Sequence, residues 1–216
     1  MLVEALENRL LPTLEDTDIA HEAEAVTDEV AEKLSSMPAD ENMDMAALAE
    51  DPQNAGVSHY VMLMGIRQGL INMFAAALYH TFEQHLLQFH RREVLSPHEE
   101  SNHSLFKVSA LKIRLQEHGI DLESLPSWRK LDELRLVANV VKHAEGDSAE
   151  QLRIARPDLF EAPSLNELDI EVTCGKPTIF LPLAGEDLYV GAEDIRSYEK
   201  AIASFWDELV ATLERV

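Results

Sequence analysis

Apolar residues recur every three to four positions along most of this chain, which is the spacing of one buried helix face. The first such pattern predicts an amphipathic helix over residues 14–37. Its apolar face consists of Ile19, Ala23, Val26, Val30 and Leu34. The Ser-Ser-Met-Pro-Ala-Asp segment at 35–40 ends this helix. We expect a short helix near 43–50 and then a linker at 51–56, which reads Asp-Pro-Gln-Asn-Ala-Gly.

The longest predicted helix covers residues 57–95 and is apolar nearly all round, which is typical of a helix at the centre of a fold. Gly65 and Gly69 lie one turn apart on it and are expected to allow close contact with another helix. Pro97 is expected to begin the next helix, which Gly119 ends. Further helices are predicted over 126–146, 148–156 and 193–214.

Alternating positions replace the helical spacing after Pro163. Residues 168–173 and 178–183 predict the two strands of a hairpin around the turn at 174–177, and 188–190 predicts a third short strand. Cys174, the lone cysteine, falls in this turn, and we interpret it as a small, half-buried structural residue rather than a nucleophile.

The predicted fold class is therefore mainly α. We expect an antiparallel helical bundle over residues 53–216, with a small β-hairpin at about 166–190 inserted before the C-terminal helix. Residues 1–52 are expected to form an acidic helical N-terminal extension.

The charge of the chain is strongly and unevenly acidic. The 216 residues carry a net charge of −22, from 40 acidic and 18 basic side chains. Residues 1–52 hold 15 of the acidic side chains against two basic ones, Arg9 and Lys33. This charge opposes non-specific attraction to nucleic acid or to anionic membranes, but it leaves room for a local basic pocket elsewhere. The acidic segment is either a partner-binding arm or a solvated helix face.

The expected cellular location is based on the lack of three features: disulfide bonds, a signal peptide and a membrane-spanning helix. A single cysteine allows no internal disulfide. The N-terminus lacks the basic start and apolar middle of a signal peptide, and no uncharged apolar run approaches the roughly 20 residues of a membrane helix. We therefore expect a cytoplasmic protein that does not cross a membrane.

The most informative segment for chemistry is residues 131–144. At about 100° per residue, Arg135, Asn139 and His143 fall within about 80° of one another, and Lys142 lies close to the same stripe. The rest of this helix is mostly apolar. Because burying an unpaired polar stripe is costly, the stripe must face polar partners, a cleft or water.

The long helix offers a facing stripe of polar side chains. It consists of Gln68, Asn72, Tyr79, Glu83 and His90. If the two helices pack face to face, Glu83 would orient and charge His143 or Arg135. A carboxylate beside an imidazole also fixes its tautomer, as general acid–base catalysis requires.

The Ala-Asn-Val-Val-Lys-His segment at 138–143 resembles the signature of HEPN domains, and the segment at 79–84 resembles the polar helix that faces it. The resemblance covers residues 57–146 and the final helix. It implies a helical bundle that often dimerises with the motif at the dimer cleft. It also implies a role in toxin–antitoxin or phage-defence systems, often as a metal-independent endoribonuclease. Asn139 and His143 match the motif, but Ala138 stands where the family has arginine, and Arg135 lies one turn earlier.

If the chain is catalytic, the resemblance implies that His143 is the general base or acid at the ribose 2′-hydroxyl or the leaving 5′-oxygen. Arg135 and Lys142 would stabilise the charge on phosphorus, and Asn139 would hold the phosphate or orient His143. Tyr79 and Glu83 would join Lys142 in binding the RNA substrate. No cofactor or metal is expected, because a di-iron bundle needs two Glu-x-x-His motifs and the chain has one, at 100–103.

The same residues allow two other interpretations. Arg135, Asn139, His143 and Glu83 could form a buried hydrogen-bonded network that only fixes helix register. The chain could also be a non-catalytic, acidic helical interaction or regulatory protein, as Ala138 and the acidic N-terminal segment suggest. Its partners would then be a protein, such as an antitoxin or defence-system subunit, or a second copy of the chain, rather than RNA.

Overall fold

The computed structural model describes residues 2–36, 45–99, 101–162 and 178–215. The described part is mainly α-helical and contains no strand. The α-helices are α1 (Leu2–Ala5), α2 (Asp16–Ser35), α3 (Met45–Phe89), α4 (Val108–Glu117), α5 (Trp128–His143), α6 (Asp147–Ala155) and α8 (Ala192–Leu213). Short helical turns are η1 (Leu6–Leu10), η2 (Leu11–Leu14), η3 (His90–Val94), η4 (His103–Leu105), η5 (Leu122–Ser124), η6 (Pro157–Phe160) and η7 (Pro182–Ala184).

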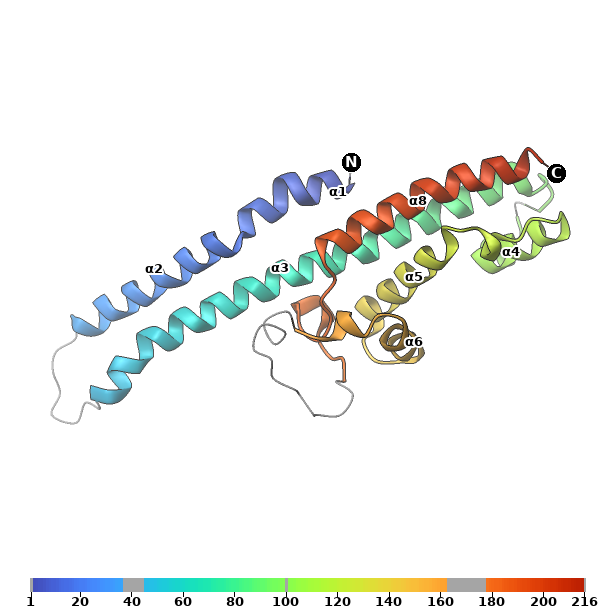
Figure 1. Ribbon diagram of the computed structural model, residues 1–216. Helices are drawn as coiled ribbons and strands as arrows, with labels where there is room; N and C mark the ends of the chain where they lie inside the picture. The colour runs from blue at the N-terminus through green and yellow to red at the C-terminus, as the bar shows by residue number, and fades with distance from the viewer. Residues whose placement is uncertain (1, 37–44, 100, 163–177, 216) are drawn as a thin grey trace.

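The other long helices are arranged along α3 (Figure 1). α2 runs antiparallel to its N-terminal half, so that Ala23 meets Gly56 while Asp16 lies near Arg67. α5 and α8 lie along its C-terminal half. α5 runs antiparallel to α3, whereas α8 begins beside the middle of α3 and runs in the same direction as α3. The antiparallel bundle expected from the sequence is therefore not confirmed. α2 and the N-terminal half of α3 extend beyond the rest of the molecule, and we call this extension the arm.

Two hydrophobic clusters form the core, and both use the C-terminal half of α3. The first contains Ile71, Ala75 and Leu78 of α3 with apolar residues of α5, α6 and α8. The second surrounds Phe82 and Leu86 and includes Phe205, whose ring centroid is 5.1 Å from that of Phe82 in an edge-on contact. This sharing explains why the second half of α3 is apolar on several sides.

The predicted linker at 51–56 is wrong, because these residues lie inside α3. Pro52 is tolerated near the N-terminal end of this 45-residue helix. Gly56 lies against α2, where an added Cβ would come within 2.9 Å of the Ala23 carbonyl oxygen. Contact with α2 therefore favours a continuous helix over the turn that the local sequence predicts.

Gly65 and Gly69 have the expected role, but a loop rather than a helix approaches them. An added Cβ at Gly65 would lie 2.8 Å from the Ala184 carbonyl oxygen, and one at Gly69 would overlap the carbonyl oxygen of Leu183. The turn η7 thus crosses directly over the backbone of α3.

Asn72 fixes this loop to α3 and is fully buried. Its side-chain amide donates to the carbonyl oxygens of Pro182 (2.7 Å) and Leu188 (2.8 Å), and its oxygen accepts from the Val190 N–H (3.3 Å). Gln68, one turn earlier, donates to Asn72 and to the Val190 carbonyl oxygen, each at 3.0 Å.

The predicted β-hairpin is not found in the described residues. Its first strand and turn, including Cys174, lie outside them, and 178–190 contains no strand. The physical reason is that side chains satisfy this backbone. Glu145 accepts the Ile179 N–H (2.9 Å), Asp187 accepts the Phe180 N–H (2.9 Å), and Asn72 bonds the remainder of the loop. A neighbouring strand is therefore not needed.

Helix boundaries elsewhere agree with the pattern, except after Pro97. There the chain forms turns and η4, and α4 begins only at Val108. Local side chains stabilise these turns, since Glu99 accepts from the Ser96 N–H (3.0 Å) and Asn102 accepts from the Ser104 N–H (3.1 Å). Gly119 ends α4 with a positive φ of 79°, as predicted.

One helical segment among the described residues, 50–94, is long and apolar enough to cross a membrane by length and composition. The sequence pattern did not predict this candidate. Its second half carries the buried, hydrogen-bonded Asn72 and packs into both core clusters. This packing accounts for the apolar character of its second half, whereas 28% of its most apolar 18-residue window is buried overall.

Replacing Asn72 with alanine should lower the free energy of unfolding by about 3 kcal/mol, because it leaves buried backbone groups of the 182–190 loop without partners. Urea denaturation followed by circular dichroism measures the change. Gln84→Ala, at an exposed position of the same helix, is the control and should change stability by less than about 0.5 kcal/mol. Equal effects of the two substitutions would contradict the role of Asn72.

Candidate functional site

The polar stripe predicted on α5 faces outward. The opposite face is buried in the core through Leu134, Val137 and Val141. Arg135 and Asn139 are half-buried, while Lys142 and His143 are exposed at the C-terminal end of the helix. Ala138, at the position of the family's arginine, is 0% exposed. Position 138 is therefore a core position in this fold rather than part of the open stripe.

Arg135 and Tyr79 lie at one cavity between α3, α4 and α5, with a volume of about 180 Å³. Phe82 and Leu131 contribute apolar walls. The Arg135 Nε donates to the Asp132 carboxylate at 2.7 Å, so its charge is locally paired. Burial raises the pKa of Tyr79 to about 12, and the nearby Glu83 carboxylate adds to this, while Arg135 opposes it.

Asn139 and His143 lie further along α5, away from this cavity. The Asn139 amide donates to the Ser148 hydroxyl (3.2 Å), which connects α5 to α6. His143 is eight residues after Arg135, or about 12 Å along the helix axis. The cavity at Arg135 does not include His143 or Lys142. In this structure Arg135 is bonded to Asp132, one turn earlier on α5, so its guanidinium and the His143 ring do not meet at one site.

Glu83 does not join these side chains either. Its carboxylate lies 3.3 Å from His80 on the same helix. The bonds of Arg135, Asn139 and Glu83 thus go to Asp132, Ser148 and His80. The hydrogen bonds found for these side chains are local, and none links them into the network considered from the sequence.

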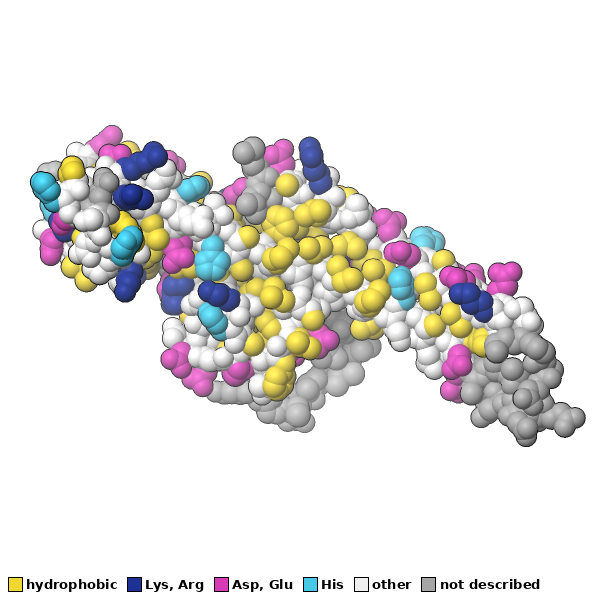
Figure 2. Space-filling view, turned by 180° about the vertical axis from the view of Figure 1, so that it is seen from behind, with side chains coloured by type: hydrophobic (Ala, Val, Ile, Leu, Met, Phe, Trp, Pro, Cys, Tyr) yellow, Lys and Arg dark blue, Asp and Glu magenta, His cyan; other side chains and the backbone are white. Residues whose placement is uncertain are grey.

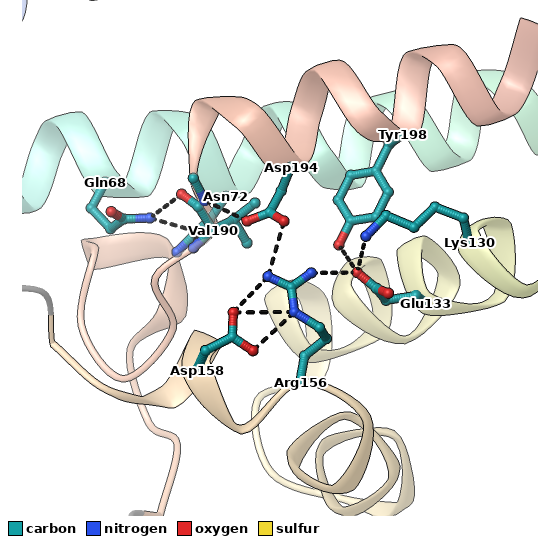
Figure 3. Close-up of polar contacts among 10 residues, drawn as sticks. Gln68, Asn72, Lys130, Glu133, Arg156, Asp158, Val190, Asp194 and Tyr198 are labelled. Atoms are coloured by element: carbon teal, nitrogen blue, oxygen red, sulfur yellow. Dashed lines mark hydrogen bonds and ion pairs between the residues drawn. The ribbon is translucent and has the colours of Figure 1, made fainter.

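A different ionic network holds α5 in place, and the sequence analysis missed it (Figure 3). Arg156 is paired with Glu133 (2.6 Å), Asp158 (2.6 Å) and Asp194 (2.9 Å), and so connects α5, η6 and α8. Asp158 lies two residues from Arg156 and could have been paired from the sequence. Asp194 lies 38 positions from Arg156, and no sequence pattern indicated that the two side chains would pair.

Glu133 receives two further hydrogen bonds in this network, from the Tyr198 hydroxyl (2.8 Å) and Lys130 (2.7 Å). Burial opposes its ionisation, but these bonds outweigh burial and lower the pKa of Glu133 below its usual value. Burial, followed by the Glu133 charge, raises the pKa of Tyr198. The paired and buried geometry indicates a structural role that fixes the orientation of α5.

Replacing Arg156 with methionine should destabilise the fold by about 3 kcal/mol, because it leaves the half-buried Asp194 without its cation and Glu133 with Lys130 as its remaining cation. The double variant Arg156→Met/Glu133→Gln should recover part of this loss, since it also removes one carboxylate charge. Thermal and urea unfolding measure both variants. Arg129→Met, at an exposed position of α5, serves as the control. A double variant no more stable than the single one would argue against charge as the cause.

His90 is the second unexpected polar residue in the core. It is 1% exposed, and neither ring nitrogen has a hydrogen-bond partner among the described residues. Burial and the nearby Arg114 lower the pKa of His90, and Glu99 only partly opposes this. Arg114 and Glu99 themselves form an ion pair of 2.5 Å beside it. His90 begins the π-helical turn η3 that ends the long helix.

The lowered pKa predicts a loss of stability in mild acid. Below about pH 6.5, the unfolded chain binds a proton at this histidine more readily than the folded chain, so the free energy of unfolding should fall from pH 7 to pH 5. His90→Phe should flatten this part of the pH profile, whereas His85→Phe, at an exposed position of α3, should not. Denaturation midpoints across this range test it. An unchanged slope in His90→Phe would refute the assignment.

The α3 apolar surface is the clearest uncovered feature of the described chain. In the arm, α2 is the one long helix that covers α3. Large side chains of α3 therefore remain exposed, with Val57 and Val61 each at 62%. We define the α3 apolar surface as the exposed residues on two sides of this helix. Val57, Tyr60 and Val61 lie on one side, and Met62, Ile66 and Met73 lie on the nearly opposite side. Phe180, Leu181 and Leu183, in and beside the turn that crosses Gly65 and Gly69, are exposed next to it.

Hydrophobic side chains gather over the middle of the molecule and continue along the arm (Figure 2). Contiguous apolar residues exposed on a protein surface often mark a binding site. In the described part of the chain, no three His, Cys, Asp or Glu side chains are grouped as metal ligands.

Comparison with known proteins gives no family for the chain. No family model matches it, and no curated protein or solved structure is significantly similar to it.

Proposed function

We propose that this chain is an acidic, non-catalytic helical interaction protein that binds a partner protein through the α3 apolar surface. The observation that carries the proposal is the arm itself, which leaves six large apolar side chains of one helix exposed. Such side chains lower the free energy of the system when a partner removes them from water, by about 25 cal/mol per Å² of apolar area.

The geometry of α5 supports the non-catalytic part of this proposal. A metal-independent ribonuclease needs its acid–base group and its cation at the same phosphate. Here Arg135 is paired with Asp132, Asn139 is bonded to Ser148, and His143 is about two turns from Arg135. Ala138 is buried and uncharged, so it does not supply the cation that the family's arginine provides at this position.

A HEPN-like endoribonuclease is the second candidate, and one observation favours it. Lys142 and His143 are exposed next to each other at the end of α5. In addition, residues 83–143 carry nine basic and nine acidic side chains, so this part of the chain lacks the strong negative charge of the remainder. A symmetric dimer could bring two such ends together.

Cleavage assays separate the two candidates. We expect purified protein to leave tRNA and single-stranded RNA intact in the presence of EDTA. If the RNA is cleaved, and His143→Ala lowers the rate at least about 100-fold while the exposed-histidine control His118→Ala does not, the ribonuclease is the correct function instead.

Partner capture tests the interaction directly. Tagged protein, cross-linked in its native cells, should carry a stoichiometric protein partner attached near residues 57–73. The double variant Val61→Asp/Ile66→Asp should lose at least about 90% of it, because two charges on the contact surface must then be desolvated. Ile154→Asp, on an exposed apolar residue of α6, is the matched control. Partner recovery that is equal in all three proteins would overturn the proposal.

A further inference from the structure

One side of the arm has a groove between α2 and α3. It contains two cavities of about 390 and 350 Å³. The first lies beside Asp16 and Arg67, and the second beside Ala23 and Val57. The first is lined mainly by η1, η2 and the first turn of α2, and the second by the next turns of α2. Gln53, Tyr60 and Arg67 recur every seven residues on one face of α3, so the two cavities lie in line along one groove. From Arg67 to Gln53 it spans 14 residues of α3, or about 21 Å.

The groove combines an apolar floor with an acidic rim. Its apolar lining consists of Leu11, Pro12, Ala20, Ala23, Val57 and Tyr60. Its carboxylates are Glu7, Glu15, Asp16 and Glu24. Arg67 lies 4.0 Å from Asp16, and Glu7 is paired with Arg196 of α8, so two of these four charges are offset. Glu15 and Glu24 supply the remaining negative charge of the rim.

The dimensions of this groove suit an α-helix. α2 and α3 approach closely at Gly56, so that their side chains form two ridges with the groove between them. A third helix placed there would cover Val57 and Tyr60, which are 62% and 36% exposed. About 21 Å of contact corresponds to about four helical turns.

We propose that the groove binds a basic amphipathic helix of a partner protein, which completes the arm as a three-helix bundle. This proposal rests on the proposed interaction function and specifies its partner. The partner's apolar face would cover the floor, and its lysine or arginine side chains would meet the carboxylates of the rim.

The charge of the groove argues against the other occupants. Its carboxylates repel RNA phosphates and anionic lipid headgroups alike. A second copy of this chain is also disfavoured, because its longest amphipathic helices, α2 and α8, are acidic, while the basic helix α5 is packed into the core of its own chain. In α2, for example, seven carboxylates accompany one lysine. Pairing two such helices would place like charges opposite each other.

A designed peptide tests the proposal on the full-length chain. The probe is a fluorescein-labelled amphipathic helix of about 18 residues, built from leucine, alanine and lysine, which is long enough to span the groove. Fluorescence anisotropy should show a Kd on the order of 10 μM at low salt, weakening as salt is added. Control peptides have either glutamate in place of lysine or the same composition in a shuffled order.

Variants of the chain locate the binding. Val57→Asp should weaken binding at least about tenfold, and Glu15→Gln/Glu24→Gln should weaken it and reduce its salt dependence. Ile154→Asp places the same charge on an exposed residue outside the groove, and it should bind as the original chain does. Circular dichroism confirms that each variant is folded.

Three results would overturn the inference: tight binding of the shuffled or glutamate peptide, no effect of Val57→Asp, or self-association of the chain that Val57→Asp abolishes. The last would identify a second copy as the occupant. If the peptide fails to bind but a native partner is still cross-linked to the α3 apolar surface, the partner chemistry is wrong and the interaction function stands. If both experiments fail, the proposed function fails too.

Discussion

The buried amide of Asn72 is the contact on which the arrangement of the C-terminal half depends. By bonding to Pro182, Leu188 and Val190, it fixes the segment before α8 against the middle of α3. The next residue, Gly191, is the N-cap of α8, and its N–H donates to the Asp194 carboxylate at 3.0 Å. The same Asp194 also pairs with Arg156. A single polar residue in an apolar helix thus determines where α8 starts and which carboxylate reaches the ionic network.

The ionic network in turn determines how α5 is presented. Because Arg156 connects Glu133 to Asp194, α5 is held with its Glu133 face inward and its apolar flank in the core. The stripe of Arg135, Asn139 and His143 is then directed away from the core, where water and local side chains solvate it. The polarity of this stripe therefore needs no catalytic explanation, although the same exposure would make it accessible to a ligand.

The sequence predicts what depends on local periodicity. The positions and limits of α2, α5 and α8 follow from apolar residues at helical spacing, and the end of α4 follows from Gly119. Predictions fail where a distant contact overrides the local signal. Residues 51–56 have the composition of a turn but are helical against α2, and 178–190 alternates like a strand but is bonded by Asn72, Glu145 and Asp187.

The candidate site was less predictable than the fold for a related reason. Helical spacing correctly places Arg135, Asn139 and His143 along one stripe, but it does not say which neighbours each will meet. Asp132 is three residues from Arg135, so this ion pair could have been predicted from helical spacing. The pairing of Arg156 with Asp194, and the placement of His90 in the core without a partner, arise only when separate helices pack together.

The buried position of Ala138 bears most directly on the resemblance to HEPN domains. An arginine at this position would extend from a fully buried Cβ, in a helix face that contributes Val137 and Val141 to the core. Its guanidinium would need either a buried anion or a route around the helix to the surface, and both are costly. An arginine substituted at this position would therefore destabilise the fold. In this fold the helix face that would carry the catalytic cation is used for packing, while the arm supplies the uncovered surface. This division of roles favours binding over catalysis.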